Sequence, residues 1–242
     1  MRFDVLTLFP DLIQSHLEFS IIKRACEENI IEVNTINPRD YTLDKHKKVD
    51  DTPYGGGAGM VLAPQPYVDS YESIKKMDST ITLMMTPQGE PFNDKLSNEL
   101  ANYAQIIILC GHYEGFDERI REIIKPREIS IGDFVLTGGE LPALCLIDSV
   151  SRKIEGTLGK IESAHDDSFS DGLLEYPQYT KPREYRGFRV PEVLLNGNHK
   201  LIEEFRYEQK LERTKLRRPD LYEKFINKDN LWSFVSKTPQ IL

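Results

Sequence analysis

The segment Gln105–Cys110 limits the possible fold more than any other part of this sequence. Its last five residues are all apolar, so the segment lacks the alternation of apolar and polar side chains that marks a half-exposed strand. A short, fully apolar run is typical of a parallel strand that helices cover on both faces of the sheet. We therefore expect the segment to be a strand that is buried on both faces of a parallel sheet in an α/β domain.

The first 36 residues favour the same class of fold. Residues 3–9 predict a buried strand, which Pro10 and Asp11 close, and residues 30–36 predict a second strand. The apolar residues between the two strands have the spacing of one helix face, and they are Leu17, Ile21, Ile22 and Ala25. A strand, a helix and a strand in this order form a parallel pair. The fold class that we predict is therefore α/β with a mostly parallel sheet.

Three successive predicted strands, at 81–85, 105–110 and 128–131, are each followed by a loop that contains glycine. The glycines of these loops are Gly89, Gly111, Gly115, Gly132, Gly138 and Gly139. In open α/β sheets, ligands bind beyond the carboxyl ends of the strands, and glycine allows a ligand to approach the backbone closely. The three loops therefore predict one small-molecule pocket that binds its ligand largely through main-chain groups. For the stretch 129–142 alone, a plain strand–turn–helix corner is the alternative.

A glycine cluster at residues 55–59 invites comparison with phosphate-binding loops. The P-loop pattern needs Gly-Lys followed by Ser or Thr, and no such residues follow the cluster. The dinucleotide fingerprint also fails, because Leu62 stands where its third glycine should be. The cluster therefore predicts either a loop that becomes ordered around a partner or a plain solvent-exposed loop.

Composition and cysteine spacing exclude several classes of protein. No apolar run approaches the roughly 20 residues that a membrane-spanning helix needs, and the strand-like start does not resemble a cleaved signal peptide. The cysteines, Cys26, Cys110 and Cys145, are odd in number and far apart. They suit the reducing cytosol and show no metal-ligand spacing. We therefore expect a cytoplasmic protein without a dedicated metal site.

The last third of the chain differs from the rest in composition. Residues 156–172 are rich in Gly, Ser and Asp and predict a mobile linker. Helical patterns follow from Asn198, a candidate N-cap, and from Pro219. Between Lys181 and Arg218, 11 basic and 6 acidic residues leave a net charge of +5, in a chain whose total is −8. Such a basic region indicates contact with phosphate, and a solvated helix held by i,i+4 ion pairs is the alternative.

Eight short motifs make the chain similar to one known family. In chain order they are PYGGGAGM (53–60), TPQG (86–89), CGHYEG (110–115), IGDFVLTGGE (131–140), DSF (167–169), GLL (172–174), YTKP (179–182) and LNGNH (195–199). Together they resemble the signatures of the bacterial tRNA (guanine-37, N1) methyltransferases, which are knotted, SPOUT-type methyltransferases. The resemblance covers nearly the whole chain in the family's order, so it is far more specific than any single motif.

The resemblance implies a domain organisation that strand patterns alone do not reveal. It implies a knotted α/β catalytic domain that binds S-adenosylmethionine at 1–159, a flexible linker at 160–172 and a small all-helical tRNA-binding domain at 173–242. The trefoil knot, on the carboxyl side of the α/β domain, is a rare exception to the unknotted rule. A homodimer is also implied, with each active site built from both subunits. The residues that match the family's S-adenosylmethionine loops are Thr86, Pro87, Gln88, Gly89, Gly111, Tyr113, Glu114, Gly115, Ile131, Gly132, Asp133, Phe134, Val135, Leu136, Gly138, Gly139 and Pro142.

The reaction that the resemblance implies needs a base and a cation. N1 of guanine carries a proton, which a base has to remove as the methyl group arrives. Negative charge then develops on O6 of the guanine, and a cation stabilises it. The resemblance places the base at Asp167 and the cation at Arg152, whereas by position alone Asp167 would be an ordinary linker acid. Family members also need Mg²⁺ for activity, and the sequence offers no identifiable site for it.

The linker and the basic helices correspond to the family's binding region for the tRNA anticodon arm. The expected tRNA-binding residues are Gly57, Gly59, Ser163, Lys181, Arg183, Asn198, His199, Arg206 and Arg213. Among the departures from the family's pattern, His112 stands where arginine is commoner and Glu175 replaces an aspartate. Two other functions stay open at this point: a non-catalytic RNA-binding protein that keeps the pocket, and a knotted methyltransferase that acts on ribose or on ribosomal RNA.

Overall fold

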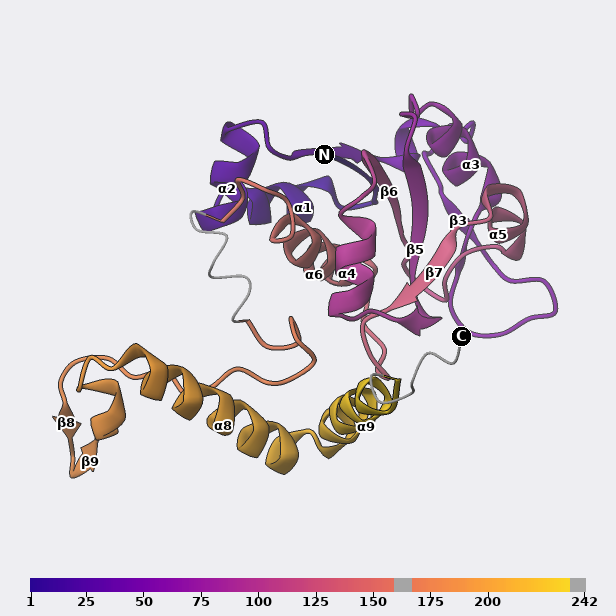
Figure 1. The fold of residues 1–242 in the computed structure, drawn as a ribbon. Coiled ribbons are helices and arrows are strands. Elements are labelled where there is room, and N and C mark those ends of the chain that lie inside the picture. Colours follow the sequence, from indigo (N-terminus) through magenta and orange to yellow (C-terminus); the bar gives the residue numbers. More distant parts are fainter. Residues whose placement is uncertain (159–166, 236–242) are drawn as a thin grey trace, which may run out of the picture. The chain divides into compact units, whose positions relative to one another are not determined.

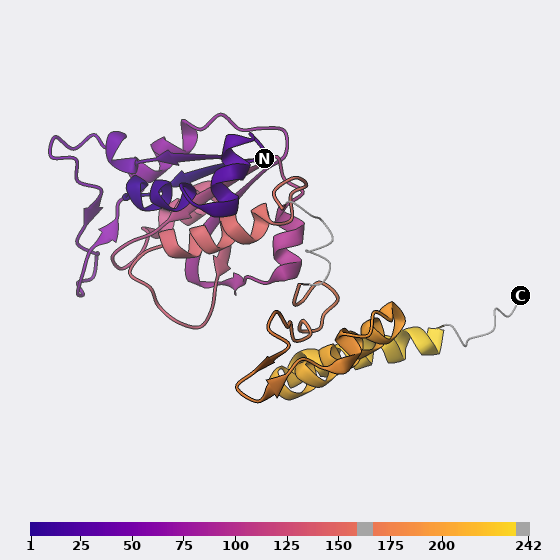
Figure 2. The same cartoon turned by 90° about the vertical axis from the view of Figure 1, so that its left-hand side faces the viewer.

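The computed structural model describes residues 1–158 and 167–235, with side chains up to residue 227. The chain divides into two compact units, Met1–Ile161 and Glu162–Leu242, which are drawn as ribbons in Figures 1 and 2. The predicted division into catalytic domain, linker and tRNA-binding domain stays a prediction. No helix among the described residues combines the length with the apolar character that crossing a lipid bilayer would require.

The first unit is built on a five-stranded sheet with the strand order β2-β1-β6-β5-β7. Its strands are β1 (Arg2–Leu6), β2 (Glu32–Ile36), β5 (Thr80–Pro91), β6 (Gln105–Cys110) and β7 (Arg127–Ser130). All neighbouring strands run parallel, so the prediction of an α/β fold with a mostly parallel sheet is confirmed. β6 lies at the centre of the sheet, and all its residues are buried.

Helices cover both faces of this sheet (Figure 1). One face carries α1 (Pro10–Leu17), α2 (Ser20–Glu27), α4 (Asp94–Leu100) and α6 (Glu140–Ser151), and the other carries α3 (Pro64–Glu72) and α5 (Glu118–Ile124). Side chains of β6 alternate between the two cores, because successive strand residues point to opposite faces. Ile106 and Ile108 pack in the first core, and Ile107 and Leu109 pack in the second. Burial on both faces explains the unbroken apolar run in the sequence.

The single helix predicted through Leu17 and Ala25 is wrong. α1 ends at Leu17, and α2 begins at Ser20, whose φ of 55° lies in the left-handed region. Ile13 of α1 and Ile22 of α2 are nevertheless buried in the same core. The apolar spacing continues across the break because both helices face that core, so the spacing does not report where one helix ends.

β5 is longer than the predicted strand 81–85, and it contains the segment that was predicted as a loop. Met85 and Glu90 both pair with Ile129 of β7, so the four residues between them form a bulge in the strand. Gly89 lies in this bulge, where an added Cβ would be 2.3 Å from the main-chain N of Ile129. Glycine therefore allows the two backbones to approach more closely than any other residue would.

Between β2 and α3 the chain forms the short helix η1 (Pro38–Asp40) and an antiparallel pair, β3 (Asp50–Asp51) and β4 (Val61–Leu62). The glycine cluster 55–59 is the loop between β3 and β4, and every residue in it is exposed. Its four glycines have φ between 80° and 131°, a region that other L-residues rarely adopt. The path of this loop therefore depends on glycine.

The described part of the second unit contains two long helices and a hairpin. α8 (His199–Arg217) begins after the predicted N-cap, Asn198, whose side chain accepts a hydrogen bond from the main-chain N of Leu201 at 3.4 Å. α9 (Pro219–Val235) begins at the predicted proline, and the short helix η2 (Glu192–Leu194) precedes α8. The prediction of an all-helical domain is wrong, because β8 (Glu184–Tyr185) and β9 (Phe188–Arg189) form an antiparallel hairpin. The missed turn is Arg-Gly, which lacks the Asn-Gly or Asp-Gly signal of most two-residue turns.

The predicted linker 160–172 lies partly outside the described residues, which resume at 167. From there the chain packs within the second unit. The main-chain N of Phe169 donates to the carbonyl O of Leu173 at 2.7 Å, and Leu173 itself is fully buried. The carboxylate of Asp171 forms an ion pair with the buried Lys210 of α8. Residues 167–172 are thus tied to α8, in contrast to the flexible segment that composition predicts.

Candidate active site

A cavity of about 570 Å³ lies at the carboxyl ends of β5, β6 and β7. Three chain segments line it: the bulge in β5, the loop after β6, and the stretch from β7 to the start of α6. A slightly larger cavity, of about 650 Å³, lies at the opposite edge of the sheet, among Met1, Arg2 and Glu32. Because ligands of open α/β sheets bind at the carboxyl ends of the strands, we take the first cavity as the candidate site.

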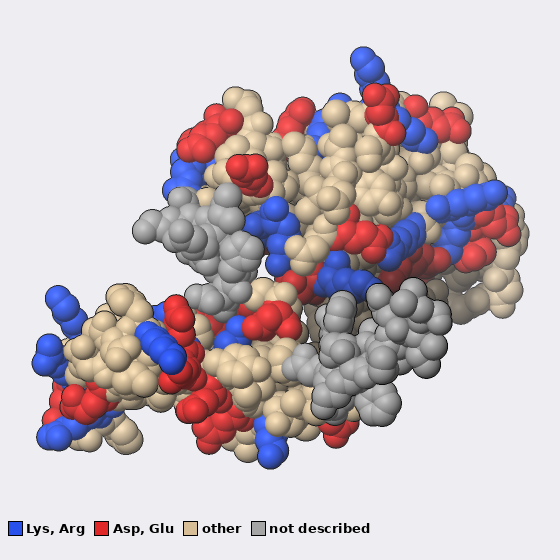
Figure 3. Space-filling model, in the orientation of Figure 1, with Lys and Arg blue, Asp and Glu red and all other residues tan. Residues whose placement is uncertain are grey.

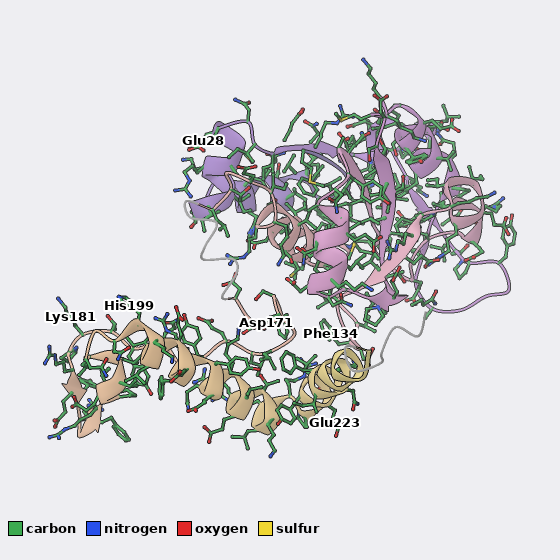
Figure 4. The ribbon with its side chains drawn as sticks, in the orientation of Figure 1. Glu28, Phe134, Asp171, Lys181, His199 and Glu223 are labelled. Carbon is green, nitrogen blue, oxygen red and sulfur yellow. The ribbon has the colours of Figure 1, made fainter. Side chains whose placement is uncertain are left out.

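The structure gathers nearly all the predicted S-adenosylmethionine residues around this cavity. Every one of them lines it except Gly89 and Asp133. Phe134, labelled in Figure 4, belongs to the lining, and its side chain is half-exposed. The prediction omitted some lining residues, which are Met85, His112, Phe116, Glu118, Arg121, Ile129, Ser130 and Thr137. Most of these lie inside or directly beside the motifs, so including whole loops would have found them.

Glycines set the distance between the loops that form the cavity. An added Cβ at Gly139 would lie 2.7 Å from the Cα of Cys110, which is backbone that cannot move aside. The main-chain N of Gly139 donates to the carbonyl O of Gly111 at 2.9 Å, and Gly138 forms an isolated β-bridge with His112. The chain that leaves β7 is therefore held against the end of β6, and side chains at these glycines would close the gap between the loops.

A buried carboxylate joins three segments directly beneath the cavity. Glu140, the first residue of α6, is 2% exposed. The hydroxyl of Thr7 donates to Oε1 of Glu140 at 2.6 Å, and Nε2 of His112 lies 2.6 Å from Oε2. Thr7 Oγ1 also accepts a hydrogen bond from the main-chain N of Phe9 at 2.9 Å. Glu140 thereby ties the end of β1 to the His112 loop, and sequence reasoning missed this network because its members are far apart in the chain.

Thr7→Val is expected to lower the free energy of unfolding by about 1–3 kcal/mol, because it leaves a buried oxygen of Glu140 and the main-chain N of Phe9 without a partner. The two side chains have nearly the same shape, so little packing is lost. Urea unfolding followed by circular dichroism measures the effect. Thr35→Val in β2 is the control, because among the described residues the hydroxyl of Thr35 makes only a 3.4 Å exposed contact with Gln14. Equal stability of both variants would show that the network contributes nothing to the fold.

Two titratable groups behind the cavity stay neutral at ordinary pH. The hydroxyl of Tyr67 donates to the carbonyl O of Cys110 at 3.1 Å. Burial raises the pKa of the Tyr67 phenol well above its usual value, and the negative charge of Glu140 adds to the effect. Burial, and then the charge of Glu140, likewise raise the pKa of the Cys110 thiol. Because the thiolate is the reactive form, Cys110 is not a candidate nucleophile.

The glycine cluster 55–59 ends beside the wall of the cavity. An added Cβ at Gly59 would lie 2.5 Å from Oε1 of Glu114, a lining residue. The main-chain N of Glu114 donates to the carbonyl O of Met60, and that of Leu62 donates to Gly115, both at 2.9 Å. This loop therefore continues from the cavity wall into solvent, where Gly57 is exposed.

The predicted catalytic residues lie in different units. Arg152 is the C-cap of α6, whose first turn borders the cavity through Pro142. Because α6 has 12 residues, its two ends are about 18 Å apart at 1.5 Å per residue. In its own chain, Arg152 therefore lies at the end of α6 that faces away from the cavity. Asp167 is half-buried in the second unit, where its carbonyl O accepts a hydrogen bond from the hydroxyl of Ser170 at 2.8 Å.

The predicted tRNA-binding residues of the second unit fall into two groups. Lys181, Arg183 and His199 are exposed, and Figure 4 labels the first and the last of them. Other members have roles in the fold: Asn198 caps α8, Arg206 lies over the ring of Tyr176 at 4.7 Å, and Arg213 is half-buried. Ser163 lies outside the described residues. The first group is therefore available for contact with phosphate.

The described residues contain no cluster of three or more His, Cys, Asp or Glu side chains that could hold a metal ion. The charged side chains around the cavity pair with one another instead. Arg121 contacts Glu128 at 3.1 Å and Glu118 at 3.2 Å. The expected need for Mg²⁺ accordingly stays a prediction without a site.

Comparison with known proteins identifies a family. The sequence model of a family described as tRNA (Guanine-1)-methyltransferase TrmD matches residues 1–224. Among similar proteins, the tRNA (guanine-N(1)-)-methyltransferase of Staphylococcus carnosus is 53% identical over 225 residues, which are 93% of this chain and 92% of that protein. The enzyme of the same name from Staphylococcus epidermidis is 54% identical over 225 residues, with the same coverage. That of a Synechococcus species is 54% identical over 224 residues, which are 93% of this chain and 88% of that protein.

Proposed function

Because the chain belongs to the tRNA (guanine-1)-methyltransferase family, we infer that it is an S-adenosylmethionine-dependent enzyme that methylates N1 of a guanine in tRNA. We propose guanine 37, next to the anticodon, as its target. The observation that carries this function is the convergence of three glycine-containing loops on one cavity. The names of the relatives specify guanine N1, so methylation of a base is favoured over methylation of ribose and over RNA binding alone.

The cavity fits S-adenosylmethionine in size and in chemistry. When bound, this molecule supplies an electrophilic methyl group on a sulfonium ion. The cavity volume of about 570 Å³ lies within the usual range of ligand pockets, and Cβ atoms at Gly138 or Gly139 would have no room beside it. The carboxylate of Glu114 along the wall suits a cationic ligand. Ile131 and Pro142 offer apolar surface for a purine ring, while main-chain groups of the loops bind its polar edges.

Asp167 and Arg152 supply the two charges that the methylation needs. The carboxylate of Asp167 accepts the proton from N1 of guanine, which leaves the N1 lone pair free to attack the methyl group. The guanidinium of Arg152 donates hydrogen bonds to O6, where negative charge develops as the proton leaves. No nucleophile of the protein takes part, in agreement with the buried, neutral thiol of Cys110. The methyl group would pass directly to N1 while its bond to sulfur breaks, and the sulfur would leave as a neutral thioether.

Subunits of a homodimer share each active site in this proposal. The position of Arg152 supports it, because Arg152 lies about 15 Å along α6 from Pro142, the α6 residue that lines the cavity of its own chain. If Arg152 is the cation beside the methyl group, it therefore comes from another copy of the chain. Leu141, Val135 and Phe134 leave half or more of their side chains exposed at or next to the cavity, as expected of a surface that a second subunit covers.

The remaining parts of the proposal follow the family. The return of the chain from β7 to the end of β6, held by the bridge between His112 and Gly138, supports the trefoil knot. The exposed basic residues of the second unit, Lys181, Arg183 and His199, support contact with the tRNA anticodon arm. We place the catalytic domain at 1–159, the linker at 160–172 and the tRNA-binding domain at 173–242. A cytoplasmic location and a requirement for Mg²⁺ complete the proposal.

Incubation with labelled S-adenosylmethionine tests the target base. A tRNA transcript with guanine at position 37 is expected to become labelled, and the same transcript with adenine at that position is not. Methylation of N1 blocks Watson–Crick pairing, so reverse transcription of the product stops at position 37, whereas ribose methylation leaves pairing intact. Label that is indifferent to base 37, or labelled tRNA that reverse transcriptase reads through, would contradict the proposed function.

A further inference from the structure

We propose that the β8–β9 hairpin is a stacking surface for unpaired bases of the tRNA, with Tyr185 and Phe188 as the stacking rings. This inference rests on the proposed function for its partner, and on the hairpin for its location. Neither residue belongs to the expected tRNA-binding set, and no sequence pattern predicted the hairpin that carries them. The geometry, the charge and the chemistry of the hairpin each support the inference.

The hairpin displays two aromatic rings on one face. Tyr185 and Phe188 are directly paired across the two strands, so their side chains point to the same side. They are 63% and 82% exposed. On the opposite face, Glu184 pairs with Arg189 through an ion pair of 2.7 Å. The hairpin thus has an aromatic face that stays in solvent and a second face held by charge.

The turn of the hairpin is short, and it fixes the positions of the two aromatic residues. Arg186 and Gly187 both have positive φ, 52° and 84°, which is the conformation of a two-residue turn that matches the twist of the strands. The main-chain N of Val190 donates to the carbonyl O of Arg183 at 2.9 Å and closes the hairpin. Side chains at the tip are consequently held in place before any partner arrives, which lowers the entropy lost on binding.

Positive charge surrounds the rings. Residues 181–189 contain four basic side chains and one acidic side chain, Glu184, which Arg189 neutralises. Among the described residues, Lys181, Arg183 and Arg186 have no ion-pair partner. The guanidinium of Arg186 lies 5.3 Å from the ring centroid of Tyr185. Figure 3 shows Lys and Arg side chains gathered at the place that β8 and β9 occupy in Figure 1.

Unpaired RNA is the partner that suits this combination. Every base offers a flat face for stacking on an aromatic ring, and the phosphates between bases need nearby cations. A protein partner with an apolar surface would have to bury the surrounding Lys and Arg side chains without counter-charges, which is unfavourable. The anticodon arm provides unpaired bases in its loop, so its chemistry matches both the rings and the cations.

Single substitutions at the two rings test the inference. Tyr185→Ala and Phe188→Ala are each expected to raise the KM for tRNA about 10-fold, the usual scale for the loss of one stacked base. The maximal rate and the affinity for S-adenosylmethionine are expected to stay at the wild-type values. Phe188→Trp is expected to retain tRNA affinity because it keeps a ring, whereas Phe188→Leu is expected to behave like the alanine variant. Tyr207→Ala, which removes a half-exposed ring from α8, is the control and is expected to keep the wild-type KM for tRNA.

The same variants distinguish the possible failures. Wild-type tRNA affinity in both alanine variants would overturn the stacking surface, provided that the wild-type enzyme methylates tRNA. Wild-type affinity in Phe188→Leu would show that the contact is merely apolar and would also overturn it. A wild-type protein that binds tRNA without methylating it would contradict the proposed function. The affinity of the alanine variants for tRNA would then be measured directly, and wild-type affinity would overturn the stacking surface. Circular dichroism shows whether each variant is folded, and the Trp and Leu variants give the comparison even if alanine unfolds the hairpin.

Discussion

Asp167→Asn is expected to reduce the maximal rate of methyl transfer by at least about 10²-fold, the usual contribution of a general base. The amide has the size of the carboxylate but cannot accept the proton from N1 of guanine. The substitution leaves unchanged the carbonyl O of residue 167, which accepts hydrogen bonds from the N and the hydroxyl of Ser170. Single-turnover kinetics at saturating tRNA and S-adenosylmethionine measure the loss.

A matched substitution separates the loss of the base from the loss of a charge. Glu212→Gln removes an exposed carboxylate from the same unit, where Glu212 contacts only Gln209 among the described residues. This variant is expected to keep the wild-type rate. S-adenosylmethionine should bind to both variants as tightly as to the wild type, because the loops proposed to hold it belong to the first unit and are unchanged in both variants. A normal rate for Asp167→Asn would remove this residue from the role of base.

Arg152→Ala is expected to lower the rate by about 10² to 10³-fold, the scale for loss of one donor to a developing oxyanion. A second variant, Gly139→Val, is expected to lose binding of S-adenosylmethionine, because its Cβ would meet the Cα of Cys110 at 2.7 Å. Each variant alone should therefore be almost inactive. The two defects affect opposite ends of α6.

Mixing these two variants tests whether the subunits share the site. If Arg152 acts on the cavity of the partner, a mixed dimer has one intact site, which combines the cavity of the Arg152→Ala chain with Arg152 of the other chain. Random exchange makes half of the dimers mixed, so about a quarter of the wild-type activity should return. Two different affinity tags show that exchange has occurred. Exchange without any return of activity would contradict a shared site. It would mean either that Arg152 acts in the site of its own chain or that the enzyme is not a homodimer.

Local pattern predicted a strand buried on both faces and the α/β class, because such burial leaves an unbroken apolar run in β6. The same kind of reasoning failed where local pattern is ambiguous. Apolar spacing joined α1 and α2 across Ser20, since both helices face one core. The bulge in β5 and the β8–β9 hairpin also escaped prediction, because each depends on pairing with another strand.

The part of the candidate site that lies in the sequence motifs was predictable. The loops that end β5, β6 and β7 carry recognisable glycines, and nearly all the predicted cofactor residues line one cavity. The network of Thr7, His112 and Glu140 was not predictable in this way. Thr7 and Glu140 are separated by 133 positions in the chain, and no local pattern links a threonine after one strand to a glutamate at the start of a distant helix.

The sequence by itself determined the α/β class, the glycines at the strand ends and, through the family's motifs, the residues proposed for chemistry. Those properties depend on neighbours in the chain, because periodic burial and turn conformation act over a few residues. Only the tertiary structure decided which loops share a cavity, that Glu140 holds two of the segments beneath it, and that α6 keeps Arg152 away from the cavity of its own chain. These arrangements depend on packing between distant segments and on the length of a rigid helix, which local residue patterns do not encode.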